Sequence, residues 1–174
     1  INPGRENPIE VSWRLASLLD AECYVYLAPA IVDSAATKQT LTRACGLDKI
    51  DQMARDLDMA VISCGDIEKQ GTSLARDIVG KNVHGELVKA GAACDIMCNF
   101  INAEGTDVAH PISERTMSVD LDVVSSAKNL VLATGGKHRA KALLAALRRL
   151  STNTLITDED AAVGTRRGRH GGGA

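Results

Sequence analysis

The feature that most constrains the fold of this chain is the segment 129–159, which combines strand and helix patterns. Asn129–Ala133 is an apolar run typical of a buried strand, and two glycines follow shortly after it. Lys137–Leu150 then repeats apolar residues at helical spacing, and Asn153–Thr157 is a second short apolar run. A strand, a glycine turn, a helix and a strand in this order predict a β-α-β unit with parallel strands.

The remainder of the chain continues the same alternation of helix and strand patterns. Apolar residues recur at helical spacing in several segments, and Asn7-Pro8 marks the start of the first helix, whose apolar stripe is Ile9, Trp13, Ala16 and Leu19. Gly46 marks the end of the second helix. The predicted helices are 8–19, 34–45, 47–57, 73–79 and 84–90. Strands are predicted at Cys23–Ala28, at Met59–Cys64 (apolar throughout, hence covered on both faces), at Ala92–Ile101 and, beyond a hairpin turn at 103–106, at Val108–Ile112.

Strands separated by helices imply an α/β fold with a mainly parallel sheet and right-handed crossovers. Because Ile1-Asn2-Pro3-Gly4 leads directly into a capped helix, we expect a domain over residues 1–165 that lacks its first strand region. Residues 166–174 are rich in Arg, Gly and His and have no apolar side chains to bury, so we expect a flexible tail there.

Composition excludes several classes of protein. A formal net charge of −2 gives no overall field that would recruit nucleic acid or an anionic membrane, and 2% aromatic residues make base-stacking platforms improbable. Five cysteines at irregular spacing, without a signal peptide or a membrane-length apolar run, favour a reducing cytoplasmic location. Buried structural thiols explain the cysteines better than metal binding, and no metal or cofactor is predicted.

The segment 134–141 is the richest candidate for a binding site. Gly135 and Gly136 allow a tight turn close to a ligand, and the helix that follows exposes backbone N–H groups that suit an anion. Lys137, Arg139 and Lys141 crowd the start of this helix, where cations are unfavourable unless an anion binds. The alternative is a solvated basic face. The glycine spacing is not that of a P-loop.

Further candidates lie at other strand and helix ends. Asp158 follows a strand and could orient a ligand hydroxyl or cap the next helix, and Asp95 interrupts an apolar strand as a structural acceptor or a sugar ligand. Gly65 ends another strand, and Gly4 and Arg5 precede the first helix.

These stretches resemble one protein family in their order and spacing. Gly91–Ile96, the turn 102–105, Ala133-Thr134-Gly135-Gly136-Lys137 and Leu155-Ile156-Thr157-Asp158-Glu159 are similar to the C-terminal sugar-binding domain of SorC/DeoR-type bacterial transcriptional regulators. The resemblance covers roughly residues 1–164. From this resemblance we expect that the given residues leave out the family's upstream helix-turn-helix domain and the first strand and glycine-threonine turn of its sugar domain.

The resemblance implies a Rossmann-like three-layer sandwich, similar to sugar-phosphate isomerases, that serves as an effector sensor in a homo-oligomer (dimer or tetramer). It implies a non-enzymatic domain that binds a sugar, polyol or sugar phosphate and modulates operator DNA binding by a helix-turn-helix domain outside this chain. Lys137 would contact the effector, Gly135 and Gly136 would shape the turn, Asp95 would face the sugar and the Gly4-Arg5 loop would close the site. Alternatives are a sugar-phosphate isomerase or lactonase that uses Lys137 with Asp95 or Asp158, and a structural oligomerisation module.

Overall fold

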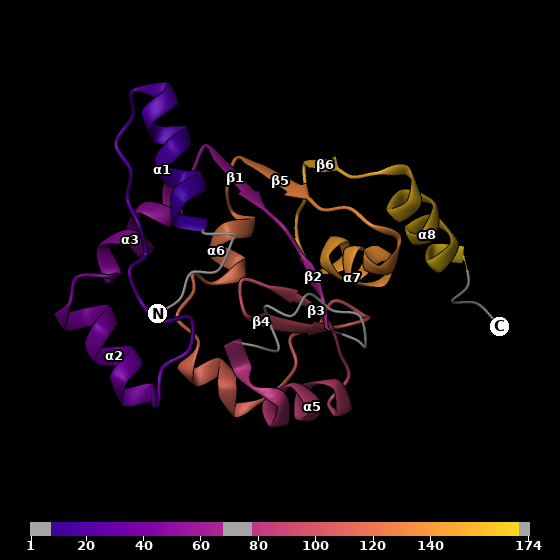
Figure 1. The fold of residues 1–174 in the computed structure, drawn as a ribbon, viewed down its shortest axis with the longest axis horizontal. Coiled ribbons are helices and arrows are strands. Elements are labelled where there is room, and N and C mark those ends of the chain that lie inside the picture. The colour runs from indigo at the N-terminus through magenta and orange to yellow at the C-terminus, as the bar shows by residue number, and fades with distance from the viewer. Residues whose placement is uncertain (1–7, 68–77, 171–174) are drawn as a thin grey trace.

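The computed structural model describes residues 8–67 and 78–170. The fold is α/β, as the sequence predicts (Figure 1). Its α-helices are α1 (Pro8–Leu19), α2 (Ala35–Ala44), α3 (Asp48–Met53), α5 (Lys81–Lys89), α6 (Leu121–Ser125), α7 (Ala140–Arg149) and α8 (Glu159–His170). Its strands are β1 (Met59–Ile62), β2 (Gly65–Asp66), β3 (Ala92–Ile96), β4 (Asn99–Asn102), β5 (Asn129–Ala133) and β6 (Thr154–Ile156). Short 3₁₀ helices occur at η1 (Ala54–Asp56), η2 (Pro111–Arg115) and η3 (Lys137–Arg139).

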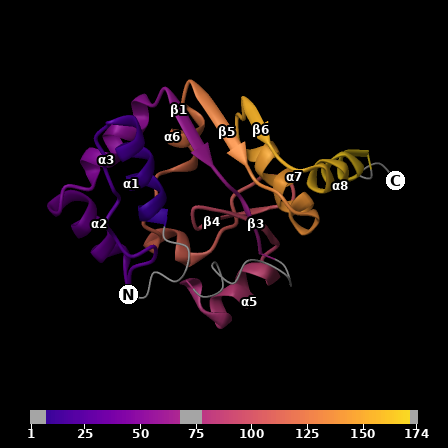
Figure 2. The same ribbon diagram turned by 45° about the horizontal axis from the view of Figure 1, so that its top comes forward.

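A parallel sheet with the strand order β1-β5-β6 holds the predicted β-α-β unit (Figure 2). Its central strand is β5, where Leu130 and Leu132 are fully buried against the core. The helix between β5 and β6 begins with the 3₁₀ turn η3 and continues as α7. The β-α-β prediction is therefore confirmed, with a tighter first helical turn than expected.

A second, antiparallel sheet has the order β2-β3-β4, and its hairpin turn lies elsewhere than predicted. The expected strand 92–101 is broken at Met97 and Cys98, which have positive φ values of 52° and 63°. Such residues rarely mark turns in a sequence. Side chains stabilise the turn here: Asp95 Oδ1 accepts a hydrogen bond from the Cys98 N–H (2.8 Å), and Asn99 Nδ2 donates to the Ile96 carbonyl (3.1 Å).

The predicted turn at 103–106 exists, but no full strand returns from it. Asn102 Oδ1 accepts from the Thr106 N–H (2.8 Å), and beyond this turn the chain makes only an isolated bridge between Ile101 and Asp107. The strand predicted at Val108–Ile112 is wrong. Pro111 starts the 3₁₀ helix η2 instead, because proline has no N–H to give to a strand ladder.

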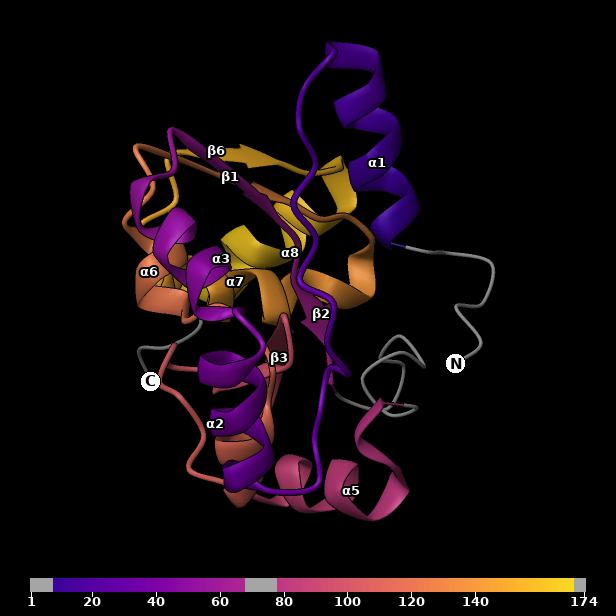
Figure 3. The same ribbon diagram turned by 90° about the vertical axis from the view of Figure 1, so that its left-hand side faces the viewer.

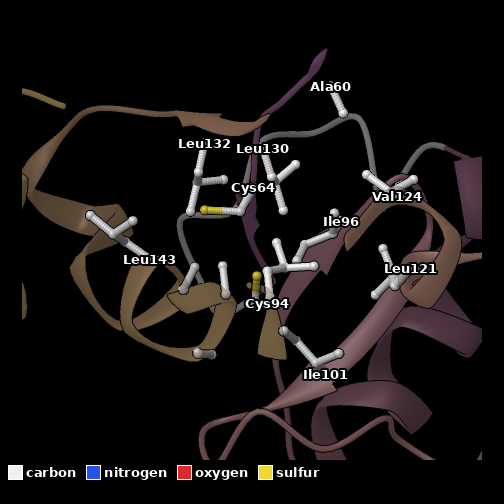
Figure 4. Close-up of a cluster of buried hydrophobic side chains, with 14 of the residues drawn as sticks. Ala60, Cys64, Cys94, Ile96, Ile101, Leu121, Val124, Leu130, Leu132 and Leu143 are labelled. Carbon is white, nitrogen blue, oxygen red and sulfur yellow. The ribbon is translucent and has the colours of Figure 1, made fainter. Parts of the chain in front are cut away.

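Helix α7 lies between the two sheets and supplies much of the core (Figure 1). Its residues Ala142, Leu143, Ala145 and Ala146 are all fully buried. They belong to one apolar cluster with residues of β1, β3, β4, β5 and α6 (Figure 4). The small alanine side chains of α7 allow the helix to approach both sheets closely.

The prediction that the β1 segment is covered on both faces is wrong. In β1, Ala60 is buried, but Met59 and Val61 are 54% and 64% exposed, because no element in the described part of the chain covers that face of the parallel sheet. In α1, Trp13 and Leu19 of the apolar stripe are exposed. Figure 3 shows α1 projecting at the periphery of the molecule.

The segment Cys23–Ala28 is not a strand. Its backbone instead makes two local hydrogen bonds, from Leu27 N–H to the Val25 carbonyl and from Ala28 N–H to the Tyr26 carbonyl, both 3.0 Å. A strand needs a neighbouring strand for its ladder, and none pairs with this segment in the described residues.

The helices predicted at 34–45, 47–57 and 84–90 are confirmed with shifted bounds, whereas α6 was not predicted. Ser34 caps α2 by accepting from the Thr37 N–H (3.1 Å), and Gly46 follows the helix with φ +77°. α3 continues into η1, and α5 begins at Lys81 rather than at His84. α8 extends to His170, so residues 166–170, expected in a flexible tail, are helical. The predicted helix 73–79 falls largely outside the described residues.

Candidate functional site

The candidate site lies where the strands of the parallel sheet end. The chain leaves β1 through Cys64, β5 through Thr134 and β6 through Thr157, and parallel strands place their carboxyl ends at one edge. Ligands of such sheets bind beyond this edge. Three groups of side chains meet there: the glycine turn with Asp158, the start of α7 with Arg139, and the Gly65–Asp95 pair.

Asp158 joins the glycine turn to the start of α8. One carboxylate oxygen, Oδ1, accepts from the Ala161 N–H at 2.8 Å, and the other, Oδ2, accepts from the Gly136 N–H. These backbone donors hold the pKa of Asp158 below its ordinary value, Ala161 having the larger effect. Asp158 is thus a helix cap, one of its two predicted roles. A contact with a ligand hydroxyl stays a prediction.

Neighbouring side chains pack so closely against Gly135 and Gly136 that neither position has room for a Cβ atom. A Cβ atom on Gly135 would lie 2.5 Å from Asp158 Oδ2. Gly136 has φ +103°, and a Cβ there would lie 2.8 Å from the His138 ring. The prediction that Gly135 and Gly136 shape a tight turn is consistent with this geometry, and the turn leaves Lys137 exposed beside it.

Arg139 lies at the start of α7 and connects two strand ends. Its Nη1 donates to Thr134 Oγ1 (3.4 Å), and the Thr134 hydroxyl donates to the Cys64 carbonyl (3.2 Å). The Arg139 Nε is buried and finds no hydrogen-bond partner within residues 8–67 and 78–170. A buried guanidinium donor without a partner is costly, and an anionic or hydroxylated ligand would satisfy it.

Gly65 and Asp95 face each other across the β2–β3 ladder. Asp95 Oδ1 accepts from the Cys98 N–H, so Asp95 is a structural acceptor, one of its two predicted roles. Burial raises the pKa of the Asp95 carboxyl to about 6, and the hydrogen bond from Cys98 lowers it in part. Whether Asp95 also faces a ligand stays a prediction.

The structure therefore brings the predicted residues into two groups. Gly135, Gly136 and Asp158 are in direct contact, and Gly65 is paired with Asp95. The hydrogen-bonded series Arg139–Thr134–Cys64 connects the two groups. Gly4 and Arg5 lie outside the described residues.

The sequence placed Thr134 and Arg139 in the candidate segment 134–141 but did not reveal the particular role of either residue. Thr134 is a buried hydroxyl between a strand and the glycine turn, and its place directly before two glycines was the available signal. Arg139 was noticed only as one cation among several. Its reach back to Thr134 depends on the 3₁₀ geometry of η3, which the residue spacing does not reveal.

Neither metal-like nor membrane-spanning features occur in the described residues. No cluster of three or more His, Cys, Asp or Glu side chains there could hold a metal ion. Among the same residues, no helix combines the length and apolarity needed to cross a bilayer.

A cavity of about 150 Å³ lies between β4, η2 and the end of α7. Its lining includes Asn99, Asp107, Asp120 and Arg149. None of the predicted site residues lines this cavity.

The fold and the strand-end site define a ligand-binding α/β domain. The family model for the "Putative sugar-binding domain" matches residues 2–164. The chain belongs to this family, the sugar-binding domains of SorC/DeoR-type transcriptional regulators.

Individual relatives agree with this membership. The transcriptional regulator LsrR from Enterobacter sp. (strain 638) is 30% identical over 149 residues, which are 83% of this chain and 46% of that protein. The erythritol catabolism regulatory protein EryD from Brucella abortus is 22% identical over 153 residues, 88% of this chain and 48% of that protein. The chain thus spans about half the length of these curated relatives.

The sorbitol operon regulator SorC from Klebsiella pneumoniae, a solved structure, superposes with a TM-score of 0.83 at 22% identity. The match covers 91% of this chain and 52% of that structure. This likeness supports the α/β fold.

Proposed function

We propose that this domain binds a sugar, polyol or sugar phosphate at the carboxyl edge of the β1-β5-β6 sheet. The observation that carries the proposal is Arg139 at the edge where the glycine turn lies: its Nη1 donates to Thr134, and its buried Nε has no hydrogen-bond partner among the described residues. Exposed Lys137 adds a second cation beside it. Relatives whose names refer to erythritol catabolism and to a sorbitol operon support a polyhydroxylated ligand.

The full-length protein is proposed to be a cytoplasmic, homo-oligomeric regulator. Ligand binding at this site would change the affinity of a helix-turn-helix domain outside this chain for operator DNA. Such a change requires that the ligand bind the DNA-bound and the free form of the protein with different affinities. Family membership among sugar-binding domains of transcriptional regulators supports this role.

Catalysis is the weaker alternative because the available carboxylates are already engaged. Asp158 accepts from two backbone N–H groups and has a lowered pKa, so it is a poor proton acceptor. Asp95 is bound to the Cys98 N–H. An isomerase or lactonase would need a free carboxylate near Lys137.

Calorimetric titration with erythritol, sorbitol, ribose and their phosphates tests the proposal. We expect binding by at least one compound and a loss of about tenfold or more in affinity in Arg139→Gln, the size typical of one charge-assisted contact. Lys49→Gln, an exposed lysine on α3, is the matched control and should bind normally. Binding that is equal in the wild type and Arg139→Gln would reject the assigned site. Turnover of a bound compound would favour the enzyme.

A further inference from the structure

The carboxylate of Asp158 occupies the position at the glycine turn that an anionic ligand would take. Its Oδ2 accepts from the Gly136 N–H, and its Oδ1 accepts from the Ala161 N–H (2.8 Å). Backbone N–H groups of this kind are what a protein offers to a bound phosphate. The carboxylate also lies against Gly135, where a Cβ atom would come within 2.5 Å of Oδ2. The turn is therefore filled by an anion that belongs to the protein.

The cations beside the turn are matched by carboxylates from the next helix. Residues 137–141 contain three basic side chains, and residues 158–160 are three consecutive acids. α8 packs against the start of α7: the Thr165 hydroxyl lies 3.3 Å from the Ala140 carbonyl oxygen, and a Cβ atom on Gly164 would lie 2.6 Å from the Ala140 Cβ. The positive charge that the sequence leaves unbalanced is thus offset by the first turn of α8, and the two segments together have no net charge to attract a phosphate.

The charge of Asp158 distinguishes an anionic ligand from an uncharged one. The hydrogen bonds from Ala161 and Gly136 lower the pKa of Asp158, so the carboxylate is ionised at neutral pH. A phosphoryl group carries about −1.5 to −2 charge at pH 7, and two anions at one turn repel each other. The hydroxyl group of an uncharged sugar can instead donate a hydrogen bond to the carboxylate, and its oxygen can accept from the buried Nε of Arg139.

We propose that Asp158 is a specificity-determining residue, which selects an uncharged sugar or polyol over its phosphate at the strand-end site. The inference rests on the proposed function, because it names the class of ligand that the same site takes. Selection of this kind uses a repulsive group against the wrong ligand, in addition to contacts that favour the right one.

Calorimetric titration of the full chain tests the proposal with matched pairs of compounds, erythritol with its phosphate monoester and sorbitol with its phosphate monoester. In the wild type, the uncharged member of a pair should bind about tenfold more tightly than the phosphate, a modest value for two like charges in contact at a protein surface. Asp158→Asn removes the charge and should raise the ratio of phosphate affinity to uncharged affinity by about tenfold. Asp158→Ser, which keeps an acceptor suited to capping α8, repeats the test with a shorter side chain.

Glu159→Gln is the matched control, because it removes one negative charge from the same turn of α8. Glu159 is exposed, and within the described residues its carboxylate makes no hydrogen bond with the glycine turn. The affinity ratio should therefore change by less than about threefold, since exposed charges are screened. An equal change in Glu159→Gln would assign the effect to α8 as a whole and overturn the role of Asp158. A wild type that binds the phosphate as tightly as the uncharged compound would overturn the proposal directly.

Inorganic phosphate gives a second measurement that needs no sugar. In Asp158→Ser, added phosphate should shift the Gly136 amide resonance until it saturates, whereas in the wild type the carboxylate already holds that N–H. The amide spectra also report whether each variant is folded. A folded variant without a shift at Gly136 would show that Asp158 does not occupy an anion position. A wild type that binds no sugar, polyol or sugar phosphate would reject the proposed function, while the Gly136 result would still decide what Asp158 excludes.

Discussion

The carboxylate of Asp158 holds the backbone N–H groups of Gly136 and Ala161 at once, so one side chain fixes both the glycine turn and the start of α8. The glycine turn follows β5, and helix α8 follows β6. Asp158 therefore couples the position of the glycine turn to that of α8.

Replacing Asp158 with Ala should lower the urea midpoint of unfolding and increase hydrogen exchange at Gly136, because both backbone N–H groups lose their acceptor. The neighbouring exposed residue offers a control: Glu159→Gln should change the midpoint little. The pKa of Asp158 is lowered in the fold, so its contribution to stability is present above the unfolded pKa of about 3.9 and is lost as the pH falls through the folded value. Equal midpoints for both variants would contradict the dual cap.

Gly136→Ala should destabilise the protein by about 1–2 kcal/mol, because φ +103° is unfavourable for alanine and its Cβ would meet His138. Gly85, in the middle of α5, has open space around it and no positive φ. Gly85→Ala should therefore stabilise the protein by roughly 0.5–1 kcal/mol. Thermal unfolding followed by circular dichroism measures both changes. The same sign for the two substitutions would refute this account of the turn.

Arg149 binds two carboxylates at the end of α7, and Arg149→Lys should weaken this contact. Its Nε and Nη2 form a fork with Asp107 (3.1 and 3.2 Å), and its Nη1 donates to Asp122 (2.7 Å). Lysine cannot make the two-pronged contact, and both carboxylates are exposed, so we expect a loss of about 0.5–1 kcal/mol in the free energy of unfolding. Arg43→Lys, on an exposed arginine of α2, should be neutral in the same denaturant titration. A neutral Arg149→Lys would show that the fork adds nothing to stability.

Asp95 should make the protein less stable as the pH rises from about 4 to 6. Its folded pKa of about 6 lies above the unfolded value, so the folded state binds the extra proton in this window. Stability is then greatest below the unfolded pKa and falls as the pH rises through the folded one, by roughly 2–3 kcal/mol for this group. Asp95→Asn keeps an acceptor for the Cys98 N–H and removes the titration. Denaturation series at several pH values should give a flatter profile for the variant.

Much of the fold could be predicted because local patterns agree with it. The apolar run at β5, the two glycines and the helical spacing of α7 all indicate one β-α-β unit, and the structure contains it. The hairpin turn at Met97 and Cys98 could not be predicted, since neither residue favours a positive φ and the turn depends on side-chain hydrogen bonds from Asp95 and Asn99. An apolar segment such as Cys23–Ala28 suggests a strand, but a strand also needs a partner.

The site was predictable only in part, for a similar reason. The rule that ligands bind at strand ends selected Gly135, Gly136 and Asp158, which the structure places in contact. Arg139 acquires its position from the 3₁₀ turn and from a hydroxyl on another strand end, and neither is visible in residue spacing.

The central position of β5 also has a kinetic consequence. In its pairing with β6, Val131 lies opposite Thr154, and in its pairing with β1, Asn129 lies opposite Met59. The loop between the paired residues is much longer in the pairing with β1. Closing the longer loop costs more entropy, so β5, α7 and β6 should assemble first and β1 should dock late. Pulse-labelled hydrogen exchange during refolding should protect Leu132 before Ala60, and simultaneous protection would show a single concerted step. The strand end that carries Cys64 would then be the last part of the site to form.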